Sequence, residues 1–355
     1  MNFKIMLSLV FTLFIATVNA QTISGYVFDE TTNKPLSGAF VYLDGTTYAA
    51  DTNAEGAFTL TVPEKINAFL VVRYLGYETV RIENPFSYTT KLRILLLPNS
   101  INLDEVVITK SNVFSRKDML KVFREQFLGK TKAGKSCKIM NEDGIVLYFD
   151  VKTNVLSATA SNPLHIINEK LEYDLLFDLM EFQVKFNGKT LADEKLRQSF
   201  YAGTTFFTDI STGKSAIDKR DKSYLGSPMH FLKALSNKEL DKEGYQLFAK
   251  GFKINQDNYM TVTDTADMKK IKLIELAEDE RPKITGINLP KAAILKSVRY
   301  EVLYKKDQSF FVFANGELYV DKNGLYWPIN ELSFGGHMSG IKVGDMLPAD
   351  YKYSK

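Results

Sequence analysis

The stretch that decides the fold is GYVFDETTNKPLSGAFVYLDGTT (residues 25–47), followed by TNAEGAFTL (52–60) and LVVRYLGYET (70–79). Apolar side chains alternate here with polar or small ones, as expected of strands that bury one face. The apolar stripes span residues 23–27, 39–43, 58–62, 70–74 and 92–96. Gly, Asn and Pro separate them at about the 8 to 12 residue spacing of sandwich strands. We therefore predict a small antiparallel β-sandwich over residues 21–98.

Four motifs within this stretch are specific enough to indicate a family. They are Gly25-x-Val27-x-Asp29, Pro35-Leu36-x-Gly38-Ala39-x-Val41, Thr52-x-x-x-Gly56-x-Phe58 and Tyr74-x-Gly76-Tyr77. Together they resemble the carboxypeptidase regulatory-like domain, which implies a transthyretin-like fold without protease residues. Such domains are abundant in the envelope of Bacteroidota, often ahead of the plug of TonB-dependent outer-membrane receptors. LDEVVIT (103–109) resembles the segment before that plug, so we expect a linker over residues 99–112.

The first twenty residues have the three parts of a secretory signal peptide. Lys4 supplies the positive charge, residues 5–15 the apolar segment, and Val18-Asn19-Ala20 the small residues at a cleavage site. Eleven residues are too few to cross a bilayer, which takes about 20. We therefore expect cleavage after Ala20 and export to the periplasm or outer membrane.

Composition excludes several classes of function. The formal net charge is only +3, which argues against the broad basic surface that nucleic-acid binding needs. Cys137 is the single cysteine, so no intrachain disulfide can form. The three histidines form no His-Glu-x-x-His or similar motif, and we expect neither a metal site nor a cofactor.

Residues 113–355 predict a β-rich α+β domain with two short helices. Ser115 and Asp118 form a capping box, and Met119, Phe123 and Phe127 recur every four residues, which predicts a helix over 116–128 ended by Gly129. A second helix is expected over 228–240, with Ser227 as N-cap and Pro228 at the first position. Strands are expected over 171–186 and 199–209, with hairpin turns at 153–154, 315–316 and 323–324.

This second half resembles the C-terminal region of other envelope proteins that carry a carboxypeptidase regulatory-like domain. The residues that carry the resemblance include Phe127-Leu128-Gly129, Pro163-Leu164, Arg220-x-x-x-Tyr224-x-Gly226-Ser227-x-x-His230-Phe231-Leu232 and Leu347-Pro348-x-x-Tyr351. The resemblance implies an architecture and a compartment, and no mechanism.

Four residues of that segment are the candidate binding residues: Arg220, Tyr224, Ser227 and His230. A hydroxyl beside an imidazole can form a nucleophile, but Ser227 is expected to cap a helix and no Gly-x-Ser-x-Gly elbow holds it. We therefore assign no catalytic residue. The charged run 214–222 is expected to be a solvated loop, except that Arg220, beside Tyr224, could pair with a carboxylate or stack on a ring.

These observations favour a non-enzymatic exported binding or scaffold protein of the cell envelope, whose partner is an envelope protein or a glycan. One alternative is a hydrolase of glycans or peptides with a site in residues 113–355, since carboxylates are plentiful. Another is an outer-membrane barrel, which two predicted helices and acidic residues within the strands disfavour.

Overall fold

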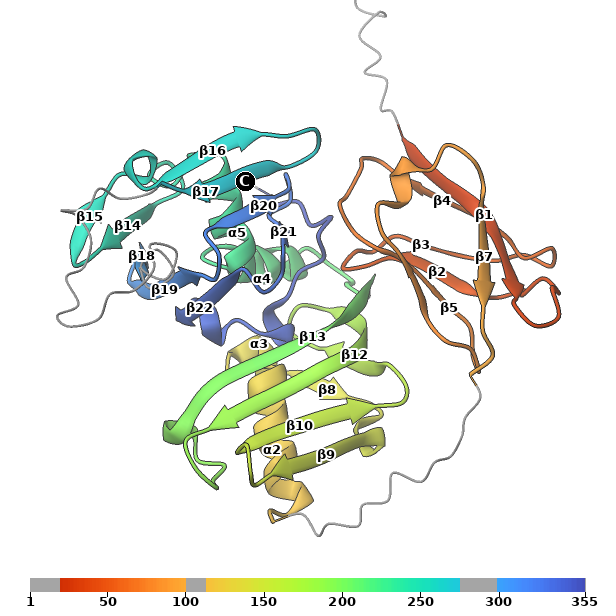
Figure 1. Ribbon diagram of the computed structural model, residues 1–355, viewed down its shortest axis with the longest axis horizontal. Coiled ribbons are helices and arrows are strands. Elements are labelled where there is room, and N and C mark those ends of the chain that lie inside the picture. Colours follow the sequence, from red (N-terminus) through yellow and green to blue (C-terminus); the bar gives the residue numbers. More distant parts are fainter. Residues whose placement is uncertain (1–19, 100–112, 275–298, 355) are drawn as a thin grey trace, which may run out of the picture. The chain divides into compact units, whose positions relative to one another are not determined.

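The computed structural model describes residues 20–99, 113–274 and 299–354, and these form two compact units (Figure 1). The first unit contains residues 20–43 and 48–99, and the second contains residues 44–47, 113–274 and 299–354. The predicted signal peptide (1–20) and linker (99–112) lie outside the described residues, apart from Ala20 and Asn99. The architecture is mainly β, as predicted.

The first unit is a sandwich of two sheets. Its strands are β1 (Gln21–Asp29), β2 (Phe40–Leu43), β3 (Ala49–Asp51), β4 (Ala57–Val62), β5 (Leu70–Arg73), β6 (Val80–Ile82) and β7 (Leu92–Leu96). One sheet has the order β4-β1-β7 and the other β3-β2-β5-β6. The predicted apolar stripes meet in one core between the sheets. All pairings are antiparallel as predicted except β1 with β7, which run parallel.

The family motifs hold the turns of this sandwich together. Asp29, at the end of β1, accepts hydrogen bonds from the backbone N–H groups of Thr31 and Thr32 at 2.8 and 2.7 Å. It also accepts one from the Tyr77 hydroxyl at 2.6 Å, and this bond holds the pKa of Asp29 below its usual value. A Cβ at Gly56 would lie 2.5 Å from the Val27 carbonyl oxygen. The structure of the sandwich therefore explains why Asp29, Tyr77 and Gly56 occur in the family motifs.

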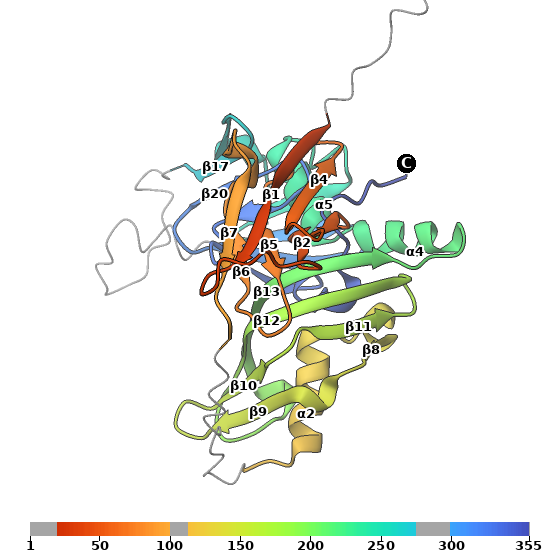
Figure 2. The same ribbon diagram turned by 90° about the vertical axis from the view of Figure 1, so that its right-hand side faces the viewer.

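The second unit begins with helix α2 (Arg116–Phe127) and a six-stranded sheet (Figure 2). Its other elements are α3 (Lys132–Lys135), β8 (Cys137–Ile139), β9 (Ile145–Asp150), β10 (Val155–Ala160), β11 (Leu164–Asn168), β12 (Tyr173–Phe186) and β13 (Leu196–Asp209). Long strand β12 pairs with β13 along one edge, and with β11 and then β10 along the other.

Helix α2 covers one face of this sheet because its apolar stripe has helical spacing. The Ser115 side chain accepts a hydrogen bond from the Asp118 N–H at 3.1 Å, so the predicted cap is confirmed. Met119, Phe123 and Phe127 are all buried, as predicted. Gly129 follows at φ +96°, a conformation that glycine adopts without strain.

The rest of the second unit packs two sheets around helix α5 (Figure 1). The helices are α4 (Ser215–Tyr224) and α5 (Pro228–Ser236). One sheet has the order β15-β14-β18-β19-β22 and the other β16-β17-β20-β21. Their bounds are β14 (Tyr245–Ala249), β15 (Phe252–Ile254), β16 (Met260–Asp264), β17 (Lys269–Leu273), β18 (Tyr300–Tyr304), β19 (Asp307–Phe313), β20 (Glu317–Val320), β21 (Tyr326–Trp327) and β22 (Leu332–Gly336).

The turn at Asn315-Gly316 is not the hairpin that we predicted. It carries the chain from β19 in one sheet to β20 in the other, and these two strands do not pair. The buried Glu331 carboxylate takes the place of a strand partner, accepting the N–H groups of Asn315 and Gly316 at 2.7 and 2.6 Å. The turns near Asn154 and Asn323 do join paired strands, as predicted.

Two predictions about helices need correction. The charged run 214–222 lies mostly in helix α4 rather than in a solvated loop, because Ala216, Arg220 and Tyr224 repeat at helical spacing and are buried. Helix α5 ends at Ser236, four residues earlier than predicted, where the Gln256 amide donates to the Leu235 carbonyl. None of the helices in the described ranges is long and apolar enough to cross a bilayer.

Candidate functional site

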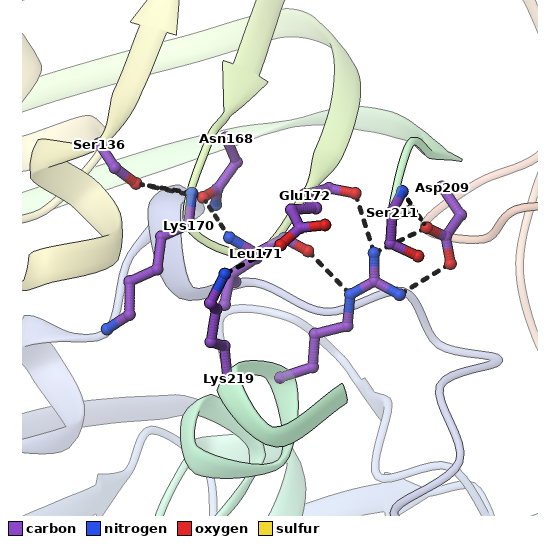
Figure 3. A network of polar contacts seen from close by, with 9 residues as sticks. Ser136, Asn168, Lys170, Leu171, Glu172, Asp209, Ser211 and Lys219 are labelled. Carbon is purple, nitrogen blue, oxygen red and sulfur yellow. Dashed lines mark hydrogen bonds and ion pairs between the residues drawn. The ribbon is translucent and has the colours of Figure 1, made fainter. Parts of the chain in front are cut away.

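Arg220 lies on α4 with only 5% of its side chain exposed. Its guanidinium donates two hydrogen bonds to the Asp209 carboxylate, at 2.7 and 2.8 Å. It donates two more, each of 2.8 Å, to the carbonyl oxygens of Leu171 and Glu172 in the β11–β12 turn (Figure 3). Arg220 therefore ties α4 both to the end of β13 and to the β11–β12 turn of the six-stranded sheet.

The ring contact and the pKa shifts of Arg220 and Asp209 agree with a charged pair. The guanidinium carbon lies 3.7 Å from the centre of the Tyr173 ring, so it stacks on an aromatic face. The hydrogen bonds from Arg220 hold the pKa of Asp209 well below its usual range. Burial opposes the charge of Arg220, but the Asp209 carboxylate outweighs it and the pKa of Arg220 is raised. Arg220 thus both pairs with a carboxylate and stacks on a ring, which is that of Tyr173.

Tyr224 lies at the C-terminal end of α4, 6% exposed, and contacts other rings. It stacks on Tyr353 with 5.3 Å between ring centres, and it lies 4.9 Å from the His230 ring. The neighbouring Asp221 accepts a hydrogen bond from the Tyr351 hydroxyl at 2.6 Å. Tyr224 and Asp221 thus form the contact between α4 and the C-terminal segment of the chain.

The Ser227 side chain contacts the backbone of His230 and not its imidazole ring. The Ser227 hydroxyl oxygen accepts a hydrogen bond from the His230 backbone N–H at 3.2 Å, which is the predicted N-cap of α5. The His230 ring bonds elsewhere. Its Nε2 lies 3.1 Å from the Glu243 carboxylate, and its Nδ1 lies 2.9 Å from the Tyr245 hydroxyl.

The contacts of His230 define its tautomer. Nδ1 accepts from the Gly226 backbone N–H at 3.2 Å, and because that group can only donate, Nδ1 carries no proton. The proton is therefore on Nε2, which donates to Glu243. Burial lowers the pKa of His230, although the Glu243 carboxylate opposes the shift. Tyr245 and the His230 ring are buried, and the Glu243 carboxylate is partly exposed.

The second unit should lose stability in mild acid because His230 is held neutral. The folded pKa lies below the unfolded value of about 6.5, so the unfolded chain binds more protons as the pH falls below that value. This contribution is complete above about pH 6.5 and is lost as the pH falls toward the folded pKa. Urea denaturation between pH 8 and pH 4.5 should show a steeper loss for the parent than for His230→Gln. Equal pH dependences would contradict this assignment.

Replacing Ser227 by alanine should cost about 0.5–2 kcal/mol of unfolding free energy, because the cap of α5 is lost. Ser227→Asp should restore most of that, since a carboxylate accepts the same hydrogen bond and suits the positive end of a helix. Thermal melts of both variants measure the two effects. An aspartate variant no more stable than the alanine variant would contradict the capping role, as would labelling of Ser227 by a serine-directed covalent probe.

All four candidate binding residues lie on α4 and α5 or the turn between them. The polar side-chain atoms of Arg220, Ser227 and His230 bond partners inside the chain, and Tyr224 packs against other rings. We did not predict from the sequence that Asp209 would pair with Arg220, or that Glu243 and Tyr245 would bond the His230 ring. The repeat of Ala216, Arg220 and Tyr224 could have revealed α4, since it places Arg220 on a buried face. Within the described ranges, no group of three or more His, Cys, Asp or Glu side chains is arranged to hold a metal ion.

Residues 23–108 match the model of a protein family described as the CarboxypepD_reg-like domain. The first unit is therefore a carboxypeptidase regulatory-like domain. It is related to TonB-dependent receptors, since the chain is 30% identical over 120 residues to the TonB-dependent receptor SusC of Bacteroides thetaiotaomicron. That match covers 33% of this chain and 11% of the receptor, so the chain spans only a small part of its relative.

Two solved structures show weak overall similarity. A type II cohesin–X-dockerin complex from Acetivibrio cellulolyticus is 22% identical, covering 32% of this chain and 79% of that chain with a TM-score of 0.20. A putative membrane-associated protein of unknown function from Bacteroides fragilis is 12% identical, covering 85% of this chain and 94% of that chain with a TM-score of 0.17.

Proposed function

We propose that this protein is an exported, non-enzymatic binding or scaffold protein of the cell envelope, accessory to outer-membrane uptake or to surface assembly. The observation that carries this proposal is the carboxypeptidase regulatory-like domain at residues 23–108, with its similarity to a TonB-dependent receptor. The proposed partner is an envelope protein or an envelope glycan, and the proposed location is the periplasm or the outer membrane.

The described side chains support a binding role over a catalytic one. Asp29 and Tyr77 of the first unit are bonded to each other, and in the second unit Ser227 caps a helix while the His230 ring bonds buried groups. These residue types often act in catalysis, but here each has a structural partner. We therefore infer that the chain acts by presenting surfaces built on two β-rich units.

Affinity purification tests this proposal. The tagged full chain is recovered from solubilised envelopes of the organism that encodes it, beside a variant lacking residues 21–98. The full chain is also tested for binding to envelope polysaccharide. We expect the full chain to capture an outer-membrane receptor or a glycan, and we expect the variant to lose that partner. A full chain that captures neither would contradict the proposal, as would a variant that keeps every partner.

A further inference from the structure

The sheet β16-β17-β20-β21 of the second unit has one face in the core and one face outside it. Ile271 of β17 and Leu318 of β20 pack into the core that contains α5, which lies next to this sheet (Figure 1). Successive side chains of a strand point to opposite faces, so the residues on either side of these two lie on the outer face. The strand pairing places six side chains there, which we call the Trp327 face: Thr263, Lys270, Lys272, Glu317, Tyr319 and Trp327.

Trp327 is the most open aromatic residue of this face. It is 53% exposed, although it pairs with Tyr319 across two neighbouring strands. The Tyr319 ring is partly covered, because the Nζ of Lys270 lies over it at 5.4 Å from the ring centre. The indole of Trp327 is therefore the ring on which another flat group can stack. The face of an aromatic ring is electrically negative, so it attracts the C–H groups on the apolar side of a sugar ring.

Glu317 is held in place next to these rings. Its Oε1 forms an ion pair of 2.7 Å with Lys270 and accepts a hydrogen bond of 3.0 Å from the Tyr319 hydroxyl. The hydrogen bond from Lys270 lowers the pKa of Glu317, so the carboxylate stays charged. Both of these bonds end on Oε1, and Oε2 keeps its capacity to accept. A carboxylate beside an ammonium can bind two adjacent hydroxyl groups, because the first accepts a donor and the second donates to an acceptor.

The Trp327 face also carries more positive than negative charge. Lys270 is paired with Glu317, whereas Lys272, which lies opposite Glu317 on β17, is exposed. The spacing of strands and of residues along them puts the Cα atoms of Lys272 and Trp327 about 12 Å apart. One extended chain of sugars can therefore contact both residues. An anionic group on that chain would complement the charge of Lys272.

The composition of this face favours a glycan over a protein as its partner. Lysine and glutamate are depleted at the centres of protein interfaces. Here Lys270 and Glu317 lie at the centre, on the two middle strands of the sheet, and Trp327 lies at its edge. Polar groups surrounding one exposed ring suit a ligand that has both an apolar face and many hydroxyl groups.

We propose that the Trp327 face binds an acidic polysaccharide, one whose sugar rings carry carboxylate groups. A sugar ring stacks on the Trp327 indole, its hydroxyl groups bond Glu317 and Lys270, and a carboxylate pairs with Lys272. This site goes beyond the proposed function, which rests on the first unit.

Calorimetric titration of the purified full chain with polysaccharides tests this site. The probes are three polymers that contain uronic acids, namely polygalacturonate, alginate and hyaluronate, and the neutral polymer dextran. We expect saturable binding to at least one of the three acidic polymers, weakened by salt, and binding to dextran at least about tenfold weaker. Binding to none of the three, or equal binding to dextran, would overturn the proposal. Capture from envelopes tests the proposed function separately, so the two can fail independently.

Two variants and a control locate the binding. Trp327→Ala should weaken binding of the acidic polymer about tenfold or more, and Lys272→Gln should weaken it and reduce its salt dependence. Phe252→Ala is the matched control, because Phe252 is 76% exposed but lies on β15 in the other sheet, and it should bind as the parent does. Unchanged binding by Trp327→Ala, or an equal loss in Phe252→Ala, would place the binding elsewhere and overturn the proposal. So would an envelope protein that the parent captures and Trp327→Ala does not, if the parent binds no acidic polymer.

Discussion

Replacing Arg220 by alanine is expected to lower the free energy of unfolding of the second unit by about 3–5 kcal/mol, mainly through its two charged hydrogen bonds to backbone carbonyls, each worth about 1.5–3 kcal/mol. The loss is large because one side chain makes four hydrogen bonds, two of them to the backbone of the β11–β12 turn. Without it, the Leu171 and Glu172 carbonyls lose their donor and Asp209 loses its counter-charge. Arg220→Lys should recover only part of the loss, since an ammonium cannot reproduce the bidentate geometry.

Lys219 is the matched control, because it lies next to Arg220 on α4 and also forms an ion pair, with Glu172 at 2.9 Å. Its side chain is 35% exposed, so Lys219→Ala should cost about 1 kcal/mol or less. Urea denaturation of both variants gives the comparison. If Arg220→Ala were neutral or stabilising, Arg220 would be better explained as a ligand-binding residue kept at a cost in stability.

Phe127→Ala should be as damaging, at about 3–5 kcal/mol, because it opens a cavity in the core between α2 and the six-stranded sheet. The Phe127 side chain is fully buried, with its ring centre 4.8 Å from that of Phe177 and 5.4 Å from that of Tyr201. These rings come from β12 and β13, so the cavity would affect the two longest strands of the unit.

Phe252 serves as the control for that change. It is 76% exposed at the start of β15, so Phe252→Ala should change stability by about 0.5 kcal/mol or less. Chemical denaturation of the full chain measures both variants. Similar losses at Phe127 and Phe252 would show that helix α2 is not held by this core.

Local sequence patterns predicted the elements whose stabilising residues lie close together in the sequence. Met119, Phe123 and Phe127 recur at helical spacing, and Ser115 and Gly129 are the residue types that begin and end helices. In the first unit, alternating apolar residues predicted β1, β2, β4, β5 and β7, and missed the three-residue strands β3 and β6.

The features that local patterns did not predict depend on partners that are distant in the sequence. Asn315-Gly316 has the composition of a hairpin turn, yet Glu331 and the pairing of β20 with β17 decide where it leads. Arg220 belongs to a charged run that is usually solvated, and its burial depends on partners in β13, β12 and the β11–β12 turn.

We propose that this chain acts in the cell envelope. The most direct test is to recover the protein from fractionated cells of the organism that encodes it and to determine its N-terminus by mass spectrometry. We predict that it sediments with the envelope or is released with the periplasm, and that it begins at Gln21. Recovery from the cytosol with Met1 still attached would contradict the account.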